Sequence, residues 1–575
     1  MNQIGMTERR RSRNETGRMP HVVSLSFALL SLLGATVPAH AAEVLTRHVR
    51  AETGVALAAP ASAVPADRQM LLDVVLPLRD RAGLDAFVAD VTSPGSPNFR
   101  HYLTPAEFTA RFGPTRADYA STVQYLVDHG LTLKGGSRDG MDIQVSGPVS
   151  AIEAAFNLKL RYYRHPTEGR LFFGPDREPT TSMGVPLWHV SGLDNYSIPH
   201  PLFVRKTDYA KAGAIRPDAI APRATTGSGP SASFLGSDMR AAYYGGASLT
   251  GAGQHLGLLE YAGTELADLD TYFSNVGQTN HVPITLVSTD GTATSCDPSG
   301  CDDGEQTLDM TQAIAMAPGL ASLTMFVGSA DTAILAAMTT RNPLPTAIGC
   351  SWGWTPADPS TLDPYFEKMA AQGQSFFAAS GDSATWSTSN AAWPADSAYV
   401  ISVGGTSLTT GSAAGAWKAE TAWSDSGGGV SPAQIAIPSW QKIRGVVNSS
   451  NRGSTAYRNG PDVSANADFT FYVCANQAGC TANEYGGTSF AAPMWAGFVA
   501  LANQQAAASG KAPVGYFNPL IYAQNQVNGA LTPAYAATFH DVASGAAGSY
   551  SAVKGYDLVT GWGSPKADLI TMLIR

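Results

Sequence analysis

One serine in this sequence stands in a context suited to nucleophilic chemistry. Residues 486–493 read Gly-Gly-Thr-Ser-Phe-Ala-Ala-Pro, and the apolar run Met494–Ala500 that follows predicts a helix. Ser489 would then lie at a helix N-terminus, where backbone N–H groups and the helix dipole stabilise a developing negative charge. A lone Gly-Thr-Ser would be better explained as a helix cap. The full string favours a nucleophile with room beside it for a substrate carbonyl.

A nucleophilic serine needs a base, and the usual base is histidine. After residue 225 the chain has only His255, His281 and His540. None of them stands in a His-Gly-Thr-His-like string, and no Asp-Ser-Gly or Asp-Thr-Gly string precedes them. The sequence therefore does not predict a histidine triad.

Three acidic residues offer the missing proton acceptor. Glu305 and Asp309 are four residues apart in a predicted helix, so both carboxylates lie on one face and one can orient the other. Acids are also common in a solvated first turn, but two like charges at this spacing repel each other. Asp382 follows the apolar strand 375–379 in a Ser-Gly-Asp loop, where a turn-forming Asp is the alternative.

Composition limits the class of protein that can position these groups. The chain has 575 residues, of which 44% are hydrophobic and 14% are charged. These values indicate a large buried core and exclude a disordered or coiled-coil protein. From Thr226 onward, 12 Lys and Arg residues stand against 25 Asp and Glu residues. This acidic balance excludes a nucleic-acid-binding face.

The first 41 residues predict a secretory signal peptide. Four arginines between positions 9 and 13 precede the apolar run Val22–Leu33 and the small-residue site Ala39-His40-Ala41. The apolar run has 12 residues, against the ~20 that a membrane span needs. An N-terminal anchor is the alternative. We expect a secreted, extracellular protein without stable membrane association.

The rest of the chain divides into two folded parts joined by a linker. Residues 42–206 alternate strands and helices in a compact α+β pattern, and residues 207–232 are rich in Ala, Gly, Pro and Ser, which is typical of an exposed linker. Residues 233–575 contain apolar strands separated by helical stretches, which predicts an α/β domain with a parallel sheet covered on both faces. The strands expected there are 256–259, 283–287, 323–327, 346–351, 375–379 and 400–403.

Five cysteines in a secreted chain favour disulfides. Cys296 with Cys301 and Cys474 with Cys480 can each close a short loop, and this pairing leaves Cys350 in an apolar run as a small buried residue. No histidines accompany these cysteines at the spacing of a zinc site. We therefore expect two local disulfides.

Taken together, these motifs resemble the sedolisins, a family of serine-carboxyl peptidases. The resemblance extends to Ser380-Gly381-Asp382, Trp393-Pro394-Ala395, Gly428-Gly429-Val430-Ser431 and Pro461-Asp462-Val463-Ser464, and it covers nearly the whole chain after the signal peptide. It implies a subtilisin-like α/β peptidase domain. It also implies that residues 66–200 belong to a ferredoxin-like activation propeptide, which acts as an intramolecular inhibitor and chaperone.

The resemblance also implies residue roles. Ser489 would be the nucleophile, Glu305 the general base and acid, and Asp309 the group that orients Glu305. Asp382 would join the Ser489 N–H in the oxyanion hole. Glu260 would extend the row of carboxylates and Trp352 would line the substrate cleft, although an ordinary loop acid and a packing aromatic are the alternatives at these two positions.

One structural Ca²⁺ ion is a further implication of the resemblance. Its ligands would be carboxylates or backbone carbonyls of Asp541, Val542, Val553, Gly555 and Asp557. Many relatives have glycine where this chain has Val553, and Lys554 adds a charge nearby. Two turn-forming aspartates without an ion are the alternative.

The function expected from the sequence is that of an acid-acting endopeptidase. It would cleave proteins or peptides through an acyl-enzyme on Ser489, and it would be made as a monomeric proenzyme that cuts itself within the linker. A tripeptidyl aminopeptidase on the same scaffold is one alternative. A catalytically silent binding protein is the other, but that reading predicts a missing Ser, Glu or Asp, and all four key residues are present.

Overall fold

The computed structural model describes residues 42–50, 62–207, 226–296, 301–390, 393–477 and 479–575. The predicted signal peptide and most of the predicted linker lie outside these residues. Among the residues that are described, no helix is both long enough and apolar enough to cross a membrane.

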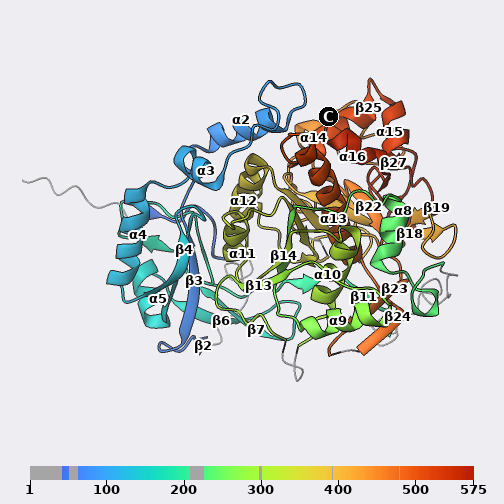
Figure 1. Cartoon of the computed structure of the whole chain (residues 1–575). Coiled ribbons are helices and arrows are strands. Elements are labelled where there is room, and N and C mark those ends of the chain that lie inside the picture. The colour runs from blue at the N-terminus through green and yellow to red at the C-terminus, as the bar shows by residue number, and fades with distance from the viewer. Residues whose placement is uncertain (1–41, 51–61, 208–225, 297–300, 391–392, 478) are drawn as a thin grey trace, which may run out of the picture. The chain divides into compact units, whose positions relative to one another are not determined.

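The first folded part is built on a four-stranded antiparallel sheet, drawn in blue and cyan in Figure 1. In chain order this part of the chain runs strand, helices, strand, strand, helix, strand, and the first and third of these strands are central in the sheet. This is the ferredoxin-like arrangement that the family resemblance implies. In sheet order the strands are β4 (Thr132–Ser137), β5 (Asp142–Pro148), β3 (Gln69–Val75) and β9 (His189–Ser191); the helices are α2 (Arg81–Thr92), α3 (Pro105–Arg111), α4 (Arg116–Asp128) and α5 (Val149–Phe156).

Local sequence explains where three of these helices begin. The side chains of Asp80, Thr104 and Thr115 each accept a hydrogen bond from a backbone N–H in the first turn of α2, α3 and α4. Such caps satisfy amide groups that have no partner inside the helix.

An eight-stranded sheet organises the second folded part. Six neighbouring strands are parallel, β22 is parallel to β18, and only β19 is antiparallel. The predicted parallel sheet is therefore confirmed. The order is β13 (Ile284–Ser288), β14 (Ser322–Val327), β12 (His255–Glu260), β15 (Ala347–Cys350), β17 (Ser375–Ala379), β18 (Ile401–Thr410) and β19 (Trp417–Ala422), with β22 (Val463–Asn466) on β18.

Strand β18 is longer than the sequence pattern predicts. We expected it to end at Val403, and it continues to Thr410 and pairs with β19. Gly404 and Gly405 interrupt the apolar pattern at that point, and the residues beyond them are largely hydroxyl-bearing. The continuing backbone pairing, rather than side-chain hydrophobicity, defines the second half of this strand.

Two pairs of helices cover the sheet. Helix α10 (Gly304–Met316) packs against α13 (Thr488–Ala508), which also contacts β15, β17 and β22. Helix α11 (Asp331–Met338) packs against α12 (Pro359–Gln372), and these contact β14 and β17 respectively. Strand β17 is thus covered on both faces. Every residue of α10 is buried, so its acidic residues do not lie in a solvated turn.

Both predicted disulfides are formed in the structure. Cys296 is bonded to Cys301, and Cys474 is bonded to Cys480 across strands β23 (Phe471–Ala475) and β24 (Gly479–Gly486). Cys350 is unpaired and buried in β15, as expected.

The two folded parts are in direct contact. Helix α2 packs against α12, and Arg81 donates to the buried carboxylate of Glu367 with an Nη2 to Oε1 distance of 2.5 Å. The Thr332 hydroxyl at the start of α11 donates to Asp73 of β3. The activation domain therefore covers the α11 and α12 side of the peptidase domain.

Candidate active site

Ser489 lies in the first turn of α13, directly after β24. Its side chain is fully buried, and its hydroxyl donates to the Ser351 carbonyl oxygen at 3.3 Å. The turn between β24 and α13 depends on Gly487, whose φ of +149° is accessible only to glycine. A helix N-terminus with a buried hydroxyl is the arrangement that the sequence predicted here.

Three buried carboxyl groups form a row beside this serine. Asp309 is in the middle, because it interacts with both Glu260 and Glu305. The Ser351 hydroxyl donates to Asp309 Oδ1 at 2.7 Å, and the Trp352 indole donates to Glu260 Oε2 at 2.9 Å. The structure thus brings together all five residues that the sequence analysis placed on this side of the site: Glu260, Glu305, Asp309, Trp352 and Ser489.

Burial dominates the electrostatics of the row. It raises the pKa of Glu260, Glu305 and Asp309 well above their ordinary values, and the charge of Asp309 raises the pKa of both neighbours further. The Ser489 hydroxyl opposes the increase at Glu305, although neither Glu305 oxygen has a partner with full hydrogen-bond geometry in the described residues. Because they interact, the three groups titrate as a set.

Asp382 reaches the start of α13 from the loop after β17. Its Oδ1 accepts hydrogen bonds from the Thr488 amide at 2.8 Å and the Thr488 hydroxyl at 2.9 Å. Its Oδ2 is buried and has no hydrogen-bond partner among the described residues. Burial raises the pKa of this carboxyl well above its ordinary value. A protonated Asp382 could therefore donate a hydrogen bond toward an oxyanion.

Among the residues that the structure describes, no histidine is hydrogen-bonded to Ser489 or to a carboxyl group of this site. His255 begins β12, whereas Glu260 ends it, so about 16 Å of strand separates them. His540 stacks on Trp417 at 3.9 Å between ring centroids, and burial lowers its pKa to about 3.

Two contributors were not identified from the sequence. Ser351 contacts both Asp309 and Ser489, and Thr488 holds Asp382. Ser351 follows the apolar strand β15, which is the same signal that pointed to Asp382. Thr488 stands beside the serine in its motif, but its bond to a loop more than 100 residues away has no sequence signature.

The backbone of residues 200–205 also enters the site. Strand β10 (His200–Pro201) pairs with β16 (Trp352–Gly353), and β11 (Val204–Arg205) pairs with β24. Between them the Leu202 carbonyl oxygen accepts a hydrogen bond from the Ser489 N–H at 3.2 Å. The end of the predicted propeptide thus contacts the candidate nucleophile.

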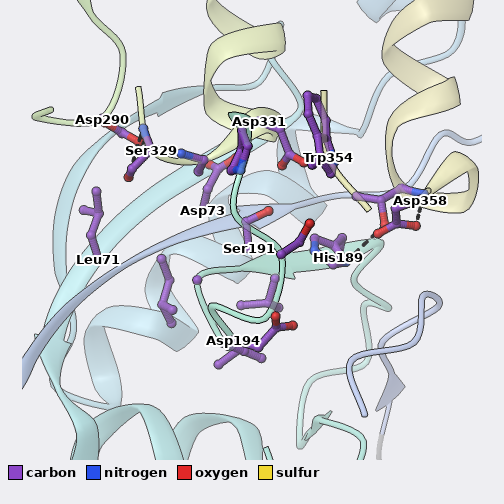
Figure 2. Close-up of a pocket in the computed structure, with 18 of the residues that line it drawn as sticks. Leu71, Asp73, His189, Ser191, Asp194, Asp290, Ser329, Asp331, Trp354 and Asp358 are labelled. Carbon is purple, nitrogen blue, oxygen red and sulfur yellow. Dashed lines mark hydrogen bonds between the residues drawn. The ribbon is translucent and has the colours of Figure 1, made fainter. Parts of the chain in front are cut away.

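A separate cavity of about 170 Å³ lies where the two folded parts meet (Figure 2). Asp73 and His189 reach it from the activation domain, and Asp290, Asp331 and Asp358 reach it from the peptidase domain. Burial raises the pKa of Asp331 to about 7. The Ser329 hydroxyl in its wall donates to Asp290. None of the residues in the Ser489 site lines this cavity.

The five predicted calcium ligands lie in adjoining C-terminal loops. The Gly555 N–H donates to Asp541 Oδ1 and the Val553 N–H donates to Asp557 Oδ2, each at 3.0 Å. Asp557 is buried, and its pKa is raised to about 7 by desolvation. The described residues contain no group of three or more His, Cys, Asp or Glu side chains that could hold a metal. Any ion here would therefore depend on carbonyls, including that of Val542.

Comparison with known proteins identifies both folded parts. Residues 58–188 match the family model described as Pro-kumamolisin, activation domain, and residues 322–533 match the Subtilase family. Kumamolisin from Bacillus sp. (strain MN-32) is 33% identical over 551 residues, covering 91% of this chain and 94% of its own. Sedolisin from Pseudomonas sp. (strain 101) is 29% identical over 565 residues, covering 90% and 89%.

Two further similarities are less extensive. A solved structure of Pseudomonas sedolisin, a serine-carboxyl proteinase complexed with two molecules of pseudo-iodotyrostatin, is 28% identical with a TM-score of 0.48, covering 59% of this chain and 96% of its own. Tripeptidyl-peptidase 1 from Rattus norvegicus is 31% identical over 225 residues, covering 35% of this chain and 37% of its own.

Proposed function

The chain belongs to the sedolisin family of serine-carboxyl peptidases, and we propose that it is a secreted, acid-acting endopeptidase that uses Ser489 as its nucleophile. The observation that carries this proposal is the gathering of buried carboxyl groups around the start of α13, where Ser489 lies. Glu305 and Asp309 belong to the row of carboxyls, and Asp382 is bonded to Thr488, the residue before the serine. The row and Asp382 support different parts of an acyl-transfer reaction.

The first part is proton transfer from the serine. Glu305 is the general base, because its buried carboxylate faces Ser489 and has no competing hydrogen bond of full geometry. Asp309 orients Glu305. Glu260 extends the row, and the Trp352 indole donates a hydrogen bond to Glu260. When the scissile bond breaks, the proton on Glu305 passes to the leaving amine. Water then hydrolyses the acyl-serine by the same route.

The second part is stabilisation of the oxyanion. The Ser489 N–H supplies one hydrogen bond at the positive end of α13. Asp382 supplies the other through Oδ2 when that carboxyl is protonated. Its raised pKa supports this state over a wider pH range than an exposed aspartate would allow. The two Thr488 bonds engage Oδ1 and leave Oδ2 without a hydrogen-bond partner among the described residues, so Oδ2 is available to the reacting carbonyl.

Action at acid pH follows from these protonation requirements. A histidine base, with an ordinary pKa of ~6.5, is protonated near pH 4. Burial favours protonated carboxyls in the row as well, but the hydrogen bonds from Ser489, Ser351 and Trp352 favour ionisation, so the first proton lost from the coupled row is proposed to supply the acceptor at acid pH. At neutral pH an ionised Asp382 would repel the oxyanion. We therefore expect a bell-shaped rate profile on the acid side.

The proenzyme organisation has two supports. The activation domain is a family feature, and in this chain residues that follow it contact Ser489. We propose that the domain inhibits the enzyme and assists its folding until the enzyme removes it. The predicted signal peptide and the similarity to kumamolisin support export, and the peptidase is proposed to act as a monomer on protein or peptide substrates.

A single Ca²⁺ ion is proposed to stabilise the C-terminal loops. Two carboxylates, Asp541 and Asp557, and the carbonyls of Val542, Val553 and Gly555 fit the all-oxygen ligand set that calcium takes, with water completing it. A cation would also offset the desolvation that raises the Asp557 pKa. The ion would supply stability and no part of the reaction.

The proposed activity is tested with a denatured protein substrate whose N-terminus is blocked. We expect the acid-treated wild type to produce internal fragments at pH 4, and Ser489→Ala to produce none. Release of tripeptides only from an unblocked substrate would instead favour a tripeptidyl aminopeptidase, the activity named for the shorter match. No hydrolysis of either substrate would support a silent relative.

A further inference from the structure

Residues 200–205 cross the candidate active site as an extended chain. Before Ser489, His200 pairs with Gly353 and Pro201 with Trp352, and the Leu202 N–H donates to the Ser351 carbonyl oxygen at 2.8 Å. After Ser489, Val204 pairs with Gly486 and Arg205 with Tyr485. Both pairings are antiparallel. The segment is thus bound by its backbone on both sides of the serine, as a substrate would be.

One peptide bond of this segment faces the reacting groups. The Leu202 carbonyl oxygen accepts a hydrogen bond from the Ser489 N–H at 3.2 Å. The point where a Cβ on Gly487 would lie is 2.6 Å from this oxygen and 2.8 Å from Asp382 Oδ2. The carbonyl is therefore bonded to the Ser489 N–H and shares the space beside Gly487 with Asp382 Oδ2. The bond presented for cleavage is that between Leu202 and Phe203.

The residues after this bond make side-chain contacts with the peptidase domain. The Phe203 ring lies 5.4 Å from the Tyr485 ring, between centroids. On the other side its Cζ is 3.3 Å from the point where a Cβ on Gly304 would lie, so a side chain there would crowd it. The Arg205 guanidinium lies over both rings, at 5.3 Å from Phe203 and 5.0 Å from Tyr485.

Arg205 also forms an ion pair with Asp302. Its Nη2 lies 2.5 Å from Asp302 Oδ2. The other oxygen, Oδ1, accepts hydrogen bonds from the Gly304 N–H and the Asn476 side chain, each at 3.2 Å. Asp302 is thereby fixed two residues before α10, the helix that carries Glu305. Its side chain is 49% exposed, so the pair contributes only modestly to binding.

We propose that Tyr485 and Asp302 form a specificity site on the leaving-group side of the cut bond. It takes an aromatic residue directly after that bond and an arginine or lysine two residues later. The chain's own Leu202–Phe203 bond is its first substrate. This inference rests on the proposed function of the Ser489 site. The maturation cut predicted within residues 207–232 would then be a later trimming step.

The cleavage step balances without any further reactant than water. Ser489 Oγ bonds to the Leu202 carbonyl carbon, and its proton passes to Glu305. The carbon–nitrogen bond then breaks, and the same proton passes to the Phe203 nitrogen, which becomes a free amine. Water hydrolyses the ester at Ser489, which leaves a carboxyl-terminal Leu202.

The experiment uses charge reversal in the full-length chain. The rate at which the Phe203 N-terminus appears at pH 4 is measured by mass spectrometry for wild type, Arg205→Glu, and Arg205→Glu combined with Asp302→Lys. We expect Arg205→Glu to slow this cut by about fivefold, the range for a half-exposed ion pair, and the double variant to recover most of the loss. Asp270→Asn, a change at an exposed carboxylate on helix α9 (Leu266–Asn275), is the matched control and should not alter the rate.

A second measurement varies the substrate only. Quenched peptides with the sequence of residues 198–207, and versions with Ala for Phe203 or Gln for Arg205, are added to the acid-treated wild type and the Asp302→Asn variant. In the wild type, kcat/KM should be higher for the peptide with Arg205 than for the peptide with Gln at that position. In the Asp302→Asn enzyme this ratio should fall to about one.

The two failures can be told apart. If the wild type degrades the blocked protein substrate but the Phe203 N-terminus never forms, or if the Arg over Gln ratio is the same in both enzymes, the specificity site is refuted and the peptidase function stands. If the protein substrate is not degraded either, the proposed function itself fails.

Discussion

Gly487→Ala tests whether a substrate carbonyl occupies the place that the structure gives it. A Cβ at this position would lie 2.6 Å from the Leu202 oxygen, 2.7 Å from Phe203 Cα and 2.8 Å from Asp382 Oδ2. Ordinary contact begins at 3.4 Å, so the carbonyl must retreat by 0.8 Å. A misplacement of about 1 Å at a reacting centre costs roughly 10²-fold in rate. We expect kcat/KM to fall by about that factor.

The substitution also carries a conformational cost. A φ of +149° is essentially restricted to glycine, and an alanine there costs about 1–3 kcal/mol of unfolding free energy. Gly510→Ala is the matched control, since Gly510 has a φ of +67° after the end of α13 and no atom within 4 Å of its added Cβ. It should lower the thermal midpoint without altering kcat/KM.

The assay is hydrolysis of a quenched peptide at pH 4, with the thermal midpoint of each variant measured in parallel. Wild-type kcat/KM in a folded Gly487→Ala enzyme would refute the placement of the carbonyl. An equal loss of kcat/KM in both variants would show that backbone strain, and not crowding of the substrate, caused the effect.

Three further predictions concern protonation and metal binding. Asp382→Asn keeps a hydrogen-bond donor that does not titrate, so the alkaline limb of the pH–rate profile should move upward even if the maximum rate falls; an unmoved limb would remove Asp382 from the oxyanion site. Chelation should lower the thermal midpoint of the wild type by a few degrees and that of Asp541→Asn by less. The reason is that an ion that binds only the folded state stabilises it by about 2.7 kcal/mol when the free ion concentration is 100 times its Kd. A midpoint insensitive to calcium would exclude the ion. Burial raises the pKa of Asp142 to about 6 and that of Asp331 to about 7. The contribution of these two carboxyls to proenzyme stability is therefore present at acid pH and lost as the pH rises through 6 to 7. The thermal midpoint of the uncleaved Ser489→Ala proenzyme should fall between pH 5 and 8, and adding Asp331→Asn should lessen that fall.

Much of the peptidase domain could be predicted from the sequence because its strands are buried on both faces. Runs such as residues 323–327 and 375–379 are largely apolar, with no charged residue, and they correspond to β14 and β17. The end of β18 was missed because Gly404 and Gly405 carry no hydrophobic signal. Backbone pairing with β19 forms that part of the strand, and the types of its residues do not indicate such pairing.

The candidate site was predictable to the extent that its residues belong to short motifs. Glu305, Asp309, Asp382 and Ser489 each stand in a recognisable string, and the fold places their strings together. The contacts of residues 200–205 were not predictable, because no feature of this segment in the sequence indicates pairing with residues 151 to 282 positions away. Those contacts depend on the complete tertiary structure.

The most direct test of the account is the pH–rate profile of the matured enzyme compared with two sets of variants. We predict a bell-shaped profile centred on the acid side and a loss of activity in Glu305→Gln of about 10²–10⁴-fold, the size typical of a general base. We also predict near wild-type rates when His255, His281 and His540 are all replaced by Gln. A wild-type maximum at pH 7–8, together with loss of activity in the triple histidine variant, would contradict the assignment of Glu305 as the base.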